Sequence, residues 1–559
     1  MKYYKDHIYI NNEYYDKLIC KNGKYFIDNV QIKNNRGINN DIVYYNHNEV
    51  INIKERATQY IVGVLLLNNN KKYGFNKKNN TLYLFKPINK NYPEFLVASN
   101  KKTKKNIYVA IEFHKWDPTS KYPIGHIIEN IGETNIIENQ IKCYLYKNNL
   151  VYPKIKINKD INNELVITND DKVYNVFSID PPNCKDIDDC ISFNKLDNNS
   201  YEIGIHITDV SHYINNVELF YNKLTTSIYY GKEQINMLPK FLSENICSLL
   251  ENNYRKCIST ILIFNSNHEL INHKIELANV YIKKNLSYDE AETIIEKNDN
   301  NYIDLIDLWK FMIKYDTSIK DTHELIEKLM VLCNKIVAET LYNYDKEKTI
   351  LRIHENTDIL SIKNKDEILT NHINKKNINA ALYSYYKSDL KNIGHSGLNL
   401  NLYTHFTSPI RRYIDIINHI NIKNVLNKKE LIAVDDKMLD NVNKLNKNIK
   451  KFNNDYKLIE LLNIKKNILN EVYEGYIIKI TINYILIYIP ILDIEYKYKF
   501  YDYNFKNIYS INVISNNKLI LKDYNNNKFI FENLKKINIL VTYLNEEVEL
   551  FNKIKIKLI

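Results

Sequence analysis

The chain has 559 residues, of which 45% are hydrophobic and 26% are charged, a composition typical of soluble globular proteins. Because domains usually have about 100–200 residues, this length predicts roughly three to five folding units. The net charge of +11 favours a polyanionic partner, although an anionic membrane surface would fit the same charge. Seven cysteines without a C-x-x-C pair argue against a disulfide framework or a zinc knuckle.

No candidate targeting or membrane segment stands out. An apolar region of the signal-peptide kind does not follow Met1, and the most apolar run, 485–492, is too short to span a bilayer. We therefore expect an intracellular protein without a membrane partner, in the cytoplasm more readily than in the nucleus or an organelle. A monomeric state is compatible with these features.

The first part of the chain, residues 7–150, consists of short apolar runs bounded by turns rich in Asn and Lys. Runs such as 60–67 and 81–85 predict β-strands. No long helical period is found in this part. We expect one or two small β-barrels here, a class that includes the OB-fold.

From about residue 170 the pattern becomes mixed. Strands at 173–179 and 201–207 precede helical periods at 321–342 and 411–425, which together predict a large α+β unit. A Lys-rich helical stretch then leads to a last β-rich region, 472–559.

Four aspartates within ten residues follow the predicted strand at 173–179, namely Asp180, Asp186, Asp188 and Asp189. Clustered carboxylates repel one another unless cations bind, and oxygen ligands around open coordination positions suit Mg²⁺ or Mn²⁺. Two such ions can activate water and stabilise the leaving oxygen of a phosphodiester. A solvated acidic turn would explain the cluster without a function. An EF-hand loop fits poorly, because Ile191 stands where that loop needs glycine.

The acidic cluster also resembles the catalytic signature of the ribonuclease II / ribonuclease R family, whose catalytic part is the RNB domain. The most specific likeness is the string Tyr-Thr-His-Phe-Thr-Ser-Pro-Ile-Arg-Arg-Tyr-Ile-Asp at 403–415. Further similar segments, in the family's order, stand at 206–213, 237–249, 286–291 and 352–355. Weaker likenesses at 35–43 and 116–133 match the two cold-shock barrels of the exosome-associated branch, and the stretch from 474 resembles its C-terminal barrel. We expect no PIN-type endonuclease domain before them.

The resemblance implies roles for particular residues. Asp180, Asp186, Asp188 and Asp189 would hold Mg²⁺ (or Mn²⁺) and the attacking water, with Asp188 the most sensitive to substitution. Arg411 would clamp the scissile phosphate, for which a planar guanidinium is suited. Tyr288 matches a tyrosine near that phosphate, and Tyr229 matches an aromatic that stacks on a terminal base.

Other residues keep two interpretations. Arg352 and His354 match a family segment, and RNA contact and structural pairing are equally open for both. Arg412 is expected to pack or pair nearby. His206, Asp209 and His212 invite a zinc interpretation, but a structural role is favoured because metal-binding histidines need convergent geometry. The family's second base-clamping aromatic has no clear counterpart between Trp309 and Asp321, and its acidic helix motif is not recognisable around 455–460.

We predict a multidomain α+β protein in which small OB-like barrels flank an RNB catalytic domain. The predicted parts are a cold-shock-like barrel at 1–55, a second one at 56–155, the RNB domain at 156–470 and a C-terminal RNA-binding barrel at 471–559. The predicted function is Mg-dependent 3′-to-5′ hydrolysis of single-stranded RNA to nucleoside 5′-monophosphates. A non-catalytic RNA-binding protein and a DNA exonuclease are the alternatives. The sequence leaves exosome-like partners open.

Overall fold

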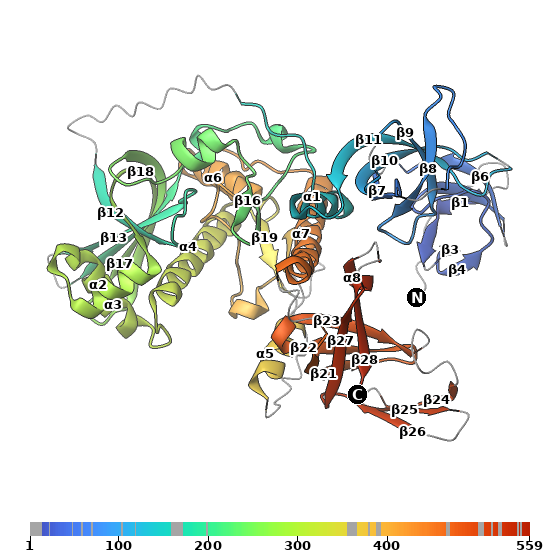
Figure 1. Cartoon of the computed structure of the whole chain (residues 1–559). Coiled ribbons are helices and arrows are strands. Elements are labelled where there is room, and N and C mark those ends of the chain that lie inside the picture. Colours follow the sequence, from blue (N-terminus) through green and yellow to red (C-terminus); the bar gives the residue numbers. More distant parts are fainter. Residues whose placement is uncertain are drawn as a thin grey trace. The chain divides into compact units, whose positions relative to one another are not determined.

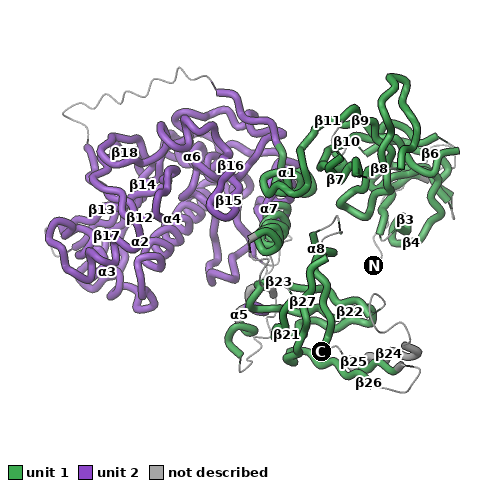
Figure 2. The backbone as a smooth tube through the Cα atoms, viewed as in Figure 1, with its two compact units in different colours: residues 1–151, 364–371, 448–559 green, residues 152–363, 372–447 purple. Residues whose placement is uncertain are grey.

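The computed structural model divides the chain into two compact units. One comprises residues 1–151, 364–371 and 448–559, and the other comprises 152–363 and 372–447 (Figure 2). The residues it describes are 14–21, 23–46, 49–57, 60–68, 71–101, 104–117, 119–157, 172–196, 200–354, 366–377, 381–386, 393–464, 470–500, 508–515, 518–523, 528–544, 547 and 550–559. The bounds of the four domains drawn from the sequence stay a prediction.

The first strands form two small antiparallel sheets around a shared apolar cluster that includes Leu18, Val43 and Val50. One sheet has the order β1-β5-β6 and the other β2-β3-β4. Their bounds are β1 (Tyr14–Lys17), β2 (Ile19–Lys21), β3 (Lys24–Ile27), β4 (Val30–Ile32), β5 (Ile42–Tyr45) and β6 (Val50–Glu55).

The next five strands close into a barrel, which confirms the expected β-barrel architecture. Their order is β10-β11-β9-β8-β7; β9 and β11 run parallel, and the other neighbouring strands of this barrel run antiparallel. The bounds are β7 (Ile61–Leu65), β8 (Thr81–Pro87), β9 (Phe95–Ser99), β10 (Ile107–Lys115) and β11 (Ile124–Glu133). Side chains that alternate inward, such as Phe85, Phe95 and Val109, fill its core.

One helix, α1 (Ile137–Lys147), follows this barrel, in a part of the chain where the sequence indicated strands and no long helical period. Its buried side chains include Cys143, Tyr144 and Leu145, while Glu138 and Lys147 lie at the ends where their charges oppose the helix dipole. The helical period was hidden because Ile, Tyr and Cys are common in strands and the helix has only 11 residues.

A second closed barrel, of order β12-β13-β14-β17-β18, forms the base of the other unit. Strand β12 runs parallel to β18, and the other neighbours are antiparallel. The bounds are β12 (Val173–Asp180), β13 (Asp189–Lys195), β14 (Tyr201–Thr208), β17 (Tyr254–Phe264) and β18 (Leu270–Ser287). The sequence predicted β12 and β14 but not the closure of this barrel.

Helices cover this barrel (Figure 1). They are α2 (Tyr288–Lys297), α3 (Ile303–Tyr315) and α4 (Thr322–Tyr344). Helix α4 begins where Asp321 accepts a hydrogen bond from the Glu324 N–H, and its buried face includes Leu325 and Leu329. The predicted helix at 321–342 is thereby confirmed.

The rest of this unit surrounds α6 (Tyr413–Leu426), a nearly fully buried helix close to the predicted 411–425. Two small two-stranded sheets, of β15 with β16 and of β19 with β20, accompany it, together with two further helices. The bounds are β15 (Ile228–Tyr230), β16 (Glu233–Ile235), β19 (Ile350–Ile353), β20 (Leu382–Tyr385), α5 (Glu367–Asn377) and α7 (Asp436–Ile464).

The last region is β-rich, as expected. A five-stranded sheet has the order β23-β22-β21-β27-β28, and a three-stranded sheet has the order β24-β25-β26. The bounds are β21 (Val472–Ile480), β22 (Tyr484–Ile489), β23 (Ile494–Lys499), β24 (Ile508–Ser515), β25 (Lys518–Asp523), β26 (Lys528–Glu532), β27 (Lys536–Tyr543), α8 (Leu550–Lys553) and β28 (Ile554–Leu558).

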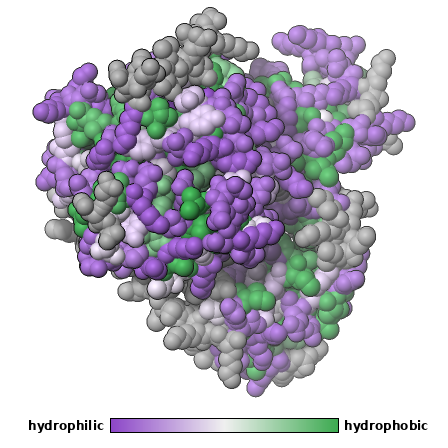
Figure 3. Space-filling model, turned by 90° about the vertical axis from the view of Figure 1, so that its left-hand side faces the viewer, coloured by the Kyte–Doolittle hydropathy of each residue, from purple (hydrophilic) through white to green (hydrophobic). Residues whose placement is uncertain are grey.

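The visible surface is mostly hydrophilic, with hydrophobic residues in small scattered groups (Figure 3). Among the described residues, no helix is both long and apolar enough to cross a membrane.

Candidate active site

The acidic loop connects two neighbouring strands of the second barrel. Asp180 ends β12 and Asp189 begins β13, so the barrel fixes both ends of the loop. Between them, the Ile187 N–H donates to Ser248 Oγ (3.1 Å), and the Ile187 carbonyl accepts from the Leu249 N–H (3.1 Å). Because Ile187 is buried and held on both sides, its neighbours Asp186 and Asp188 are directed by a rigid backbone.

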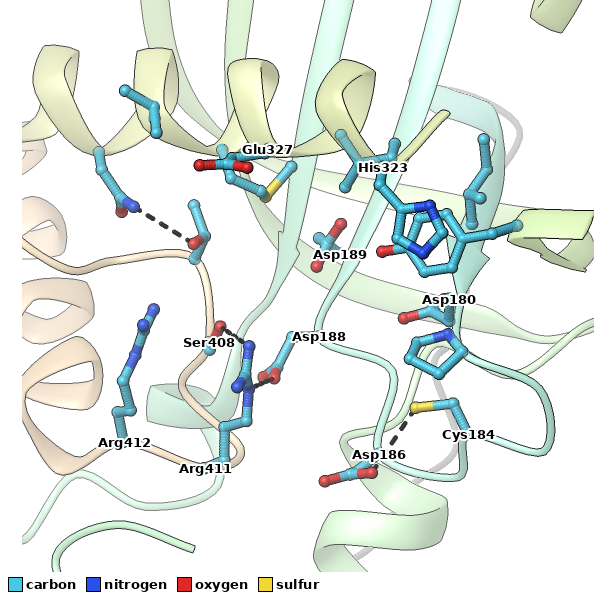
Figure 4. Close-up of a pocket in the computed structure, with 18 of the residues that line it drawn as sticks. Asp180, Cys184, Asp186, Asp188, Asp189, His323, Glu327, Ser408, Arg411 and Arg412 are labelled. Carbon is cyan, nitrogen blue, oxygen red and sulfur yellow. Dashed lines mark hydrogen bonds and ion pairs between the residues drawn. The ribbon is translucent and has the colours of Figure 1, made fainter. Parts of the chain in front are cut away.

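All four aspartates line one cavity of about 640 Å³ (Figure 4). The other polar or aromatic side chains that line it are Tyr229, Tyr288, His323, Glu327, Asn334, Tyr403, Thr407, Ser408, Arg411 and Arg412. The cavity thus joins segments more than 200 residues apart in the sequence.

Asp188 is the most enclosed of the four carboxylates, with 4% of the residue exposed. Its Oδ1 accepts from the Ile410 N–H (2.8 Å), and its Oδ2 accepts from Arg411 Nε (3.4 Å). Burial raises the pKa of Asp188 to about 7, and the nearby Arg411 guanidinium limits the rise. A proton and a metal cation would therefore compete with each other for this carboxylate near neutral pH.

The neighbouring carboxylates are also destabilised in their charged form. Burial raises the pKa of Asp180 to about 6. Burial and then the charge of Asp180 raise the pKa of Asp189 well above its ordinary value. The Asp180 Oδ2 atom is buried and has no hydrogen-bond partner. A bound cation would satisfy this oxygen and remove the repulsion between the carboxylates.

The aspartates fit a hard divalent cation if waters or substrate oxygens complete its coordination shell. Among the described side chains, no three His, Cys, Asp or Glu residues are arranged as a complete ligand group. Mg²⁺ usually takes one or two carboxylates and completes its shell with waters and substrate phosphate oxygens. The donor set therefore suits a metal that binds together with its substrate.

The two arginines of the 403–415 string have different surroundings. Arg412 forms a bidentate pair with the buried Asp415 (Nε to Oδ2 3.0 Å, Nη2 to Oδ1 2.7 Å), and Asp415 Oδ1 also accepts from the Ser408 N–H (2.8 Å). Arg412 is thus the pairing residue that the sequence suggested. Arg411 donates through Nη2 to Ser408 Oγ (3.0 Å), and 46% of its side chain is exposed. Its guanidinium lies beside Asp188 at the cavity (Figure 4).

Two predicted aromatic residues line the same cavity. Tyr229, on β15, donates its hydroxyl hydrogen to Asp186 Oδ2 (2.7 Å). Tyr288 begins α2, and its ring is stacked on that of His323 with centroids 3.6 Å apart. Burial, then the charges of Asp189 and Asp180, raise the pKa of Tyr288 to about 12, so its phenol keeps its proton.

Sequence reasoning missed the cavity residues of α4. His323, Glu327, Met330 and Asn334 recur at helical spacing and line the cavity from one side. This polar stripe beside the apolar face of α4 was the available signal. The stretch between Trp309 and Asp321, where an aromatic clamp was sought, instead packs Trp309 and Tyr315 against the core.

The remaining predicted residues lie elsewhere. Neither Arg352 nor His354 is among the described residues that line the cavity. His206 is buried in the barrel between Ser192 Oγ (2.9 Å) and Ser259 Oγ (2.7 Å), which agrees with a structural role. His212 is exposed and lies 3.4 Å from Lys256 Nζ.

Comparisons with known proteins identify the central part of the chain. Residues 169–305 and 303–428 match the RNB domain, and residues 82–149 match the Dis3-like cold-shock domain 2. The chain therefore carries an RNB domain over residues 169–428. The family resemblance and the fold class inferred from the sequence are thereby confirmed.

The proteins similar to this chain include exonucleases and one pseudonuclease. The chain is 27% identical to the exosome complex exonuclease RRP44 of Mus musculus over 65% of this chain and 47% of that protein. The chain thus spans about half the length of the curated relatives it matches. Its fold is similar to that of Mycoplasma genitalium RNase R in complex with ribose-methylated single-stranded RNA (TM-score 0.76, 19% identity, 98% of this chain and 100% of that one). It is also similar to that of yeast Ssd1, a pseudonuclease (TM-score 0.66, 14% identity, 97% and 96%).

Proposed function

We propose that this protein is a Mg²⁺-dependent exoribonuclease that hydrolyses single-stranded RNA from the 3′ end and releases nucleoside 5′-monophosphates. The observation that carries the proposal is that four carboxylates and Arg411 line one cavity of an RNB domain. The exonuclease names of its relatives and the RNA bound to the similar RNase R support it.

The carboxylates would hold the metal and position water at the phosphate. Asp180, Asp188 and Asp189 are the candidates, because burial removes solvent from their carboxylates and raises their pKa. A metal cation can replace the proton that each of these carboxyls would otherwise hold. When bound, Mg²⁺ supplies charge neutralisation at the phosphate and a more acidic water.

Arg411 would bind the scissile phosphate. Its contact with Asp188 is long (3.4 Å) and nearly half of its side chain is exposed, so the guanidinium can exchange this contact for phosphate oxygens. Charge that develops on those oxygens would be stabilised by a fixed cation in a partly desolvated site.

The tyrosines would orient the end of the strand. Tyr288 keeps its phenol protonated and can donate a hydrogen bond near the phosphate. Tyr229 is held by Asp186 and is 39% exposed, which leaves a ring face available to a base. Stacking of this kind does not depend on base identity, as a general RNA-degrading enzyme requires.

A non-catalytic RNA-binding protein is the second candidate, because the fold is also similar to that of a pseudonuclease. The complete set of four aspartates in one cavity favours catalysis instead. A DNA exonuclease would share the chemistry, and the 2′-hydroxyl is the feature by which a site can distinguish the two substrates.

The test is incubation with 5′-labelled single-stranded RNA or matched DNA, in Mg²⁺ or in EDTA. We expect a metal-dependent ladder that shortens from the 3′ end with RNA only. Asp188→Asn should reduce hydrolysis at least about 100-fold, because a ligand is lost, while RNA binding persists. Asp307→Asn, which breaks only a surface pair with Lys195, is the matched control. RNA that is bound but uncut in every metal would support the pseudonuclease instead.

A further inference from the structure

A second set of polar side chains, near the active-site cavity, has buried nitrogen atoms without a hydrogen-bond partner among the described residues. Arg352, on β19, donates its backbone N–H to the Tyr403 carbonyl (2.8 Å), and its guanidinium lies 4.4 Å from the ring centroid of Tyr383. The Arg352 Nη1 atom is buried and makes no hydrogen bond. No carboxylate among the described residues forms an ion pair with it, since Asp415 is occupied by Arg412.

Two histidines extend this set. His354 is two residues after Arg352 and therefore lies on the same side of the extended chain. Its Nδ1 accepts from the Gly397 N–H (2.9 Å), so the neutral ring carries its hydrogen on Nε2. That Nε2 is buried without a partner, as is Nδ1 of His395, whose ring lies 5.0 Å from that of His354.

Buried polar groups without a hydrogen-bond partner lower the stability of the fold unless a ligand or water binds them. An unsatisfied buried polar group costs its full desolvation penalty, and a buried unpaired cation costs more. Water could satisfy the imidazole hydrogen but would leave the guanidinium charge uncompensated. The guanidinium and the Nε2–H are donors that match oxygen atoms of a phosphate.

Neighbours of this set line the cavity in which the RNA would lie, although the three residues themselves do not. Tyr403, whose carbonyl holds Arg352, lines that cavity, and so does Leu398, next to Gly397. Arg412 also lines the cavity and is close enough to lower the pKa of Arg352. All of these residues belong to one compact unit.

We propose that Arg352, His354 and His395 form a phosphate-binding subsite, distinct from the one at Arg411, that holds a phosphate of the RNA strand or of the released mononucleotide. This inference rests on the proposed function, since it concerns the substrate of the same cavity. We designate these three residues the Arg352 subsite.

The first measurement is the affinity for labelled single-stranded RNA in EDTA, where no hydrolysis occurs. Arg352→Gln should weaken binding about tenfold, the effect of one lost charge-assisted hydrogen bond. The slope of log affinity against log salt concentration should become shallower by about 0.7, as for one lost phosphate contact on a single strand. His354→Phe, which removes the Nε2 donor, should weaken binding in the same direction.

Two further arms distinguish the sources of the phosphate. RNAs with one neutral methylphosphonate linkage should reveal a position that weakens binding to the wild type but not to Arg352→Gln. Such a position assigns the subsite to the strand. Competition by a nucleoside 5′-monophosphate that disappears in Arg352→Gln would instead assign it to the product.

Thermal unfolding tests the alternative of a structural role. Arg255 is the matched control, since its guanidinium donates to the carbonyls of Ser248, Tyr254 and Asn245. We expect Arg255→Gln to lower the Tm and Arg352→Gln to leave it unchanged or higher, because an unpaired charge is removed. A lower Tm with an unchanged salt slope for Arg352→Gln would overturn the proposal. If the wild type binds RNA through this phosphate contact but does not hydrolyse RNA, only the proposed activity is overturned.

Discussion

Two opposed effects act on the protonation of the Asp188 carboxyl. Its burial favours the neutral carboxyl, whereas the Ile410 N–H and Arg411 favour the carboxylate. The local sequence revealed the four aspartates because they are close together along the chain. His323 and Glu327 were not predicted, because they lie more than 130 residues further along and look like ordinary polar positions of a helix.

The raised pKa of Asp188 has a consequence for stability. A carboxyl whose pKa is about 7 when folded and about 4 when unfolded binds its proton more tightly in the folded state. Its contribution to stability is therefore present at low pH and is lost as the pH rises from about 4 to about 7. We expect the Tm of the metal-free protein to fall over this range, and Asp188→Asn to reduce the fall.

Mg²⁺ should reverse that loss, because cations bind the ionised carboxylates. Calorimetry at pH 5.5 and pH 7.5 should give a larger Mg²⁺-induced increase in Tm at the higher pH. An equal increase at both values, or an undiminished one in Asp188→Asn, would contradict the assignment of these carboxylates as metal ligands.

At the scale of elements, the 403–412 loop is held between Asp188 and the first turn of α6. Helix α6 supplies Asp415, which fixes both Arg412 and the Ser408 N–H. The sequence predicted β12, α4 and α6 because their periods are local. It did not predict the closed barrel, because closure depends on the parallel pairing of β12 with β18, about 100 residues away.

This arrangement separates the effects of two neighbouring arginines. Asp415→Asn should lower the free energy of unfolding by about 3 kcal/mol, since it leaves Arg412 without its buried partner. Arg411→Gln should reduce hydrolysis at least about 100-fold with little change in unfolding, because its guanidinium is half exposed. Urea unfolding and single-turnover rates measure the two effects. Equal destabilisation by both variants would refute the distinction.

At the scale of the whole molecule, one unit is assembled from both ends of the chain. Lys147 and Asn148, at the end of α1, bond to Asp455 on α7 (3.0 and 2.8 Å), and the Tyr144 hydroxyl accepts from the Leu550 N–H (3.3 Å). No local pattern predicts such contacts, which is why the sequence indicated consecutive domains in this part.

Asp455→Ala should therefore loosen α1, whose Lys147 is 308 residues away in sequence. We expect a loss of about 2 kcal/mol, because two charged or buried hydrogen bonds disappear. Hydrogen exchange of the α1 amides measures it, with the exposed Asp440 on the same helix as the matched Asp→Ala control. Unchanged protection in Asp455→Ala would contradict the role of this contact.

The same contacts set an order of events during synthesis. The partners of α1 leave the ribosome 308 and 406 residues after it. At roughly 5–20 residues per second, α1 would wait roughly 20–80 s before both are available. Helix α1 can pack against β7, β10 and β11 at once, because these strands precede it. The groups that bind Asp455 and Leu550 stay uncovered during that interval, so the nascent chain exposes there a surface that the finished protein covers.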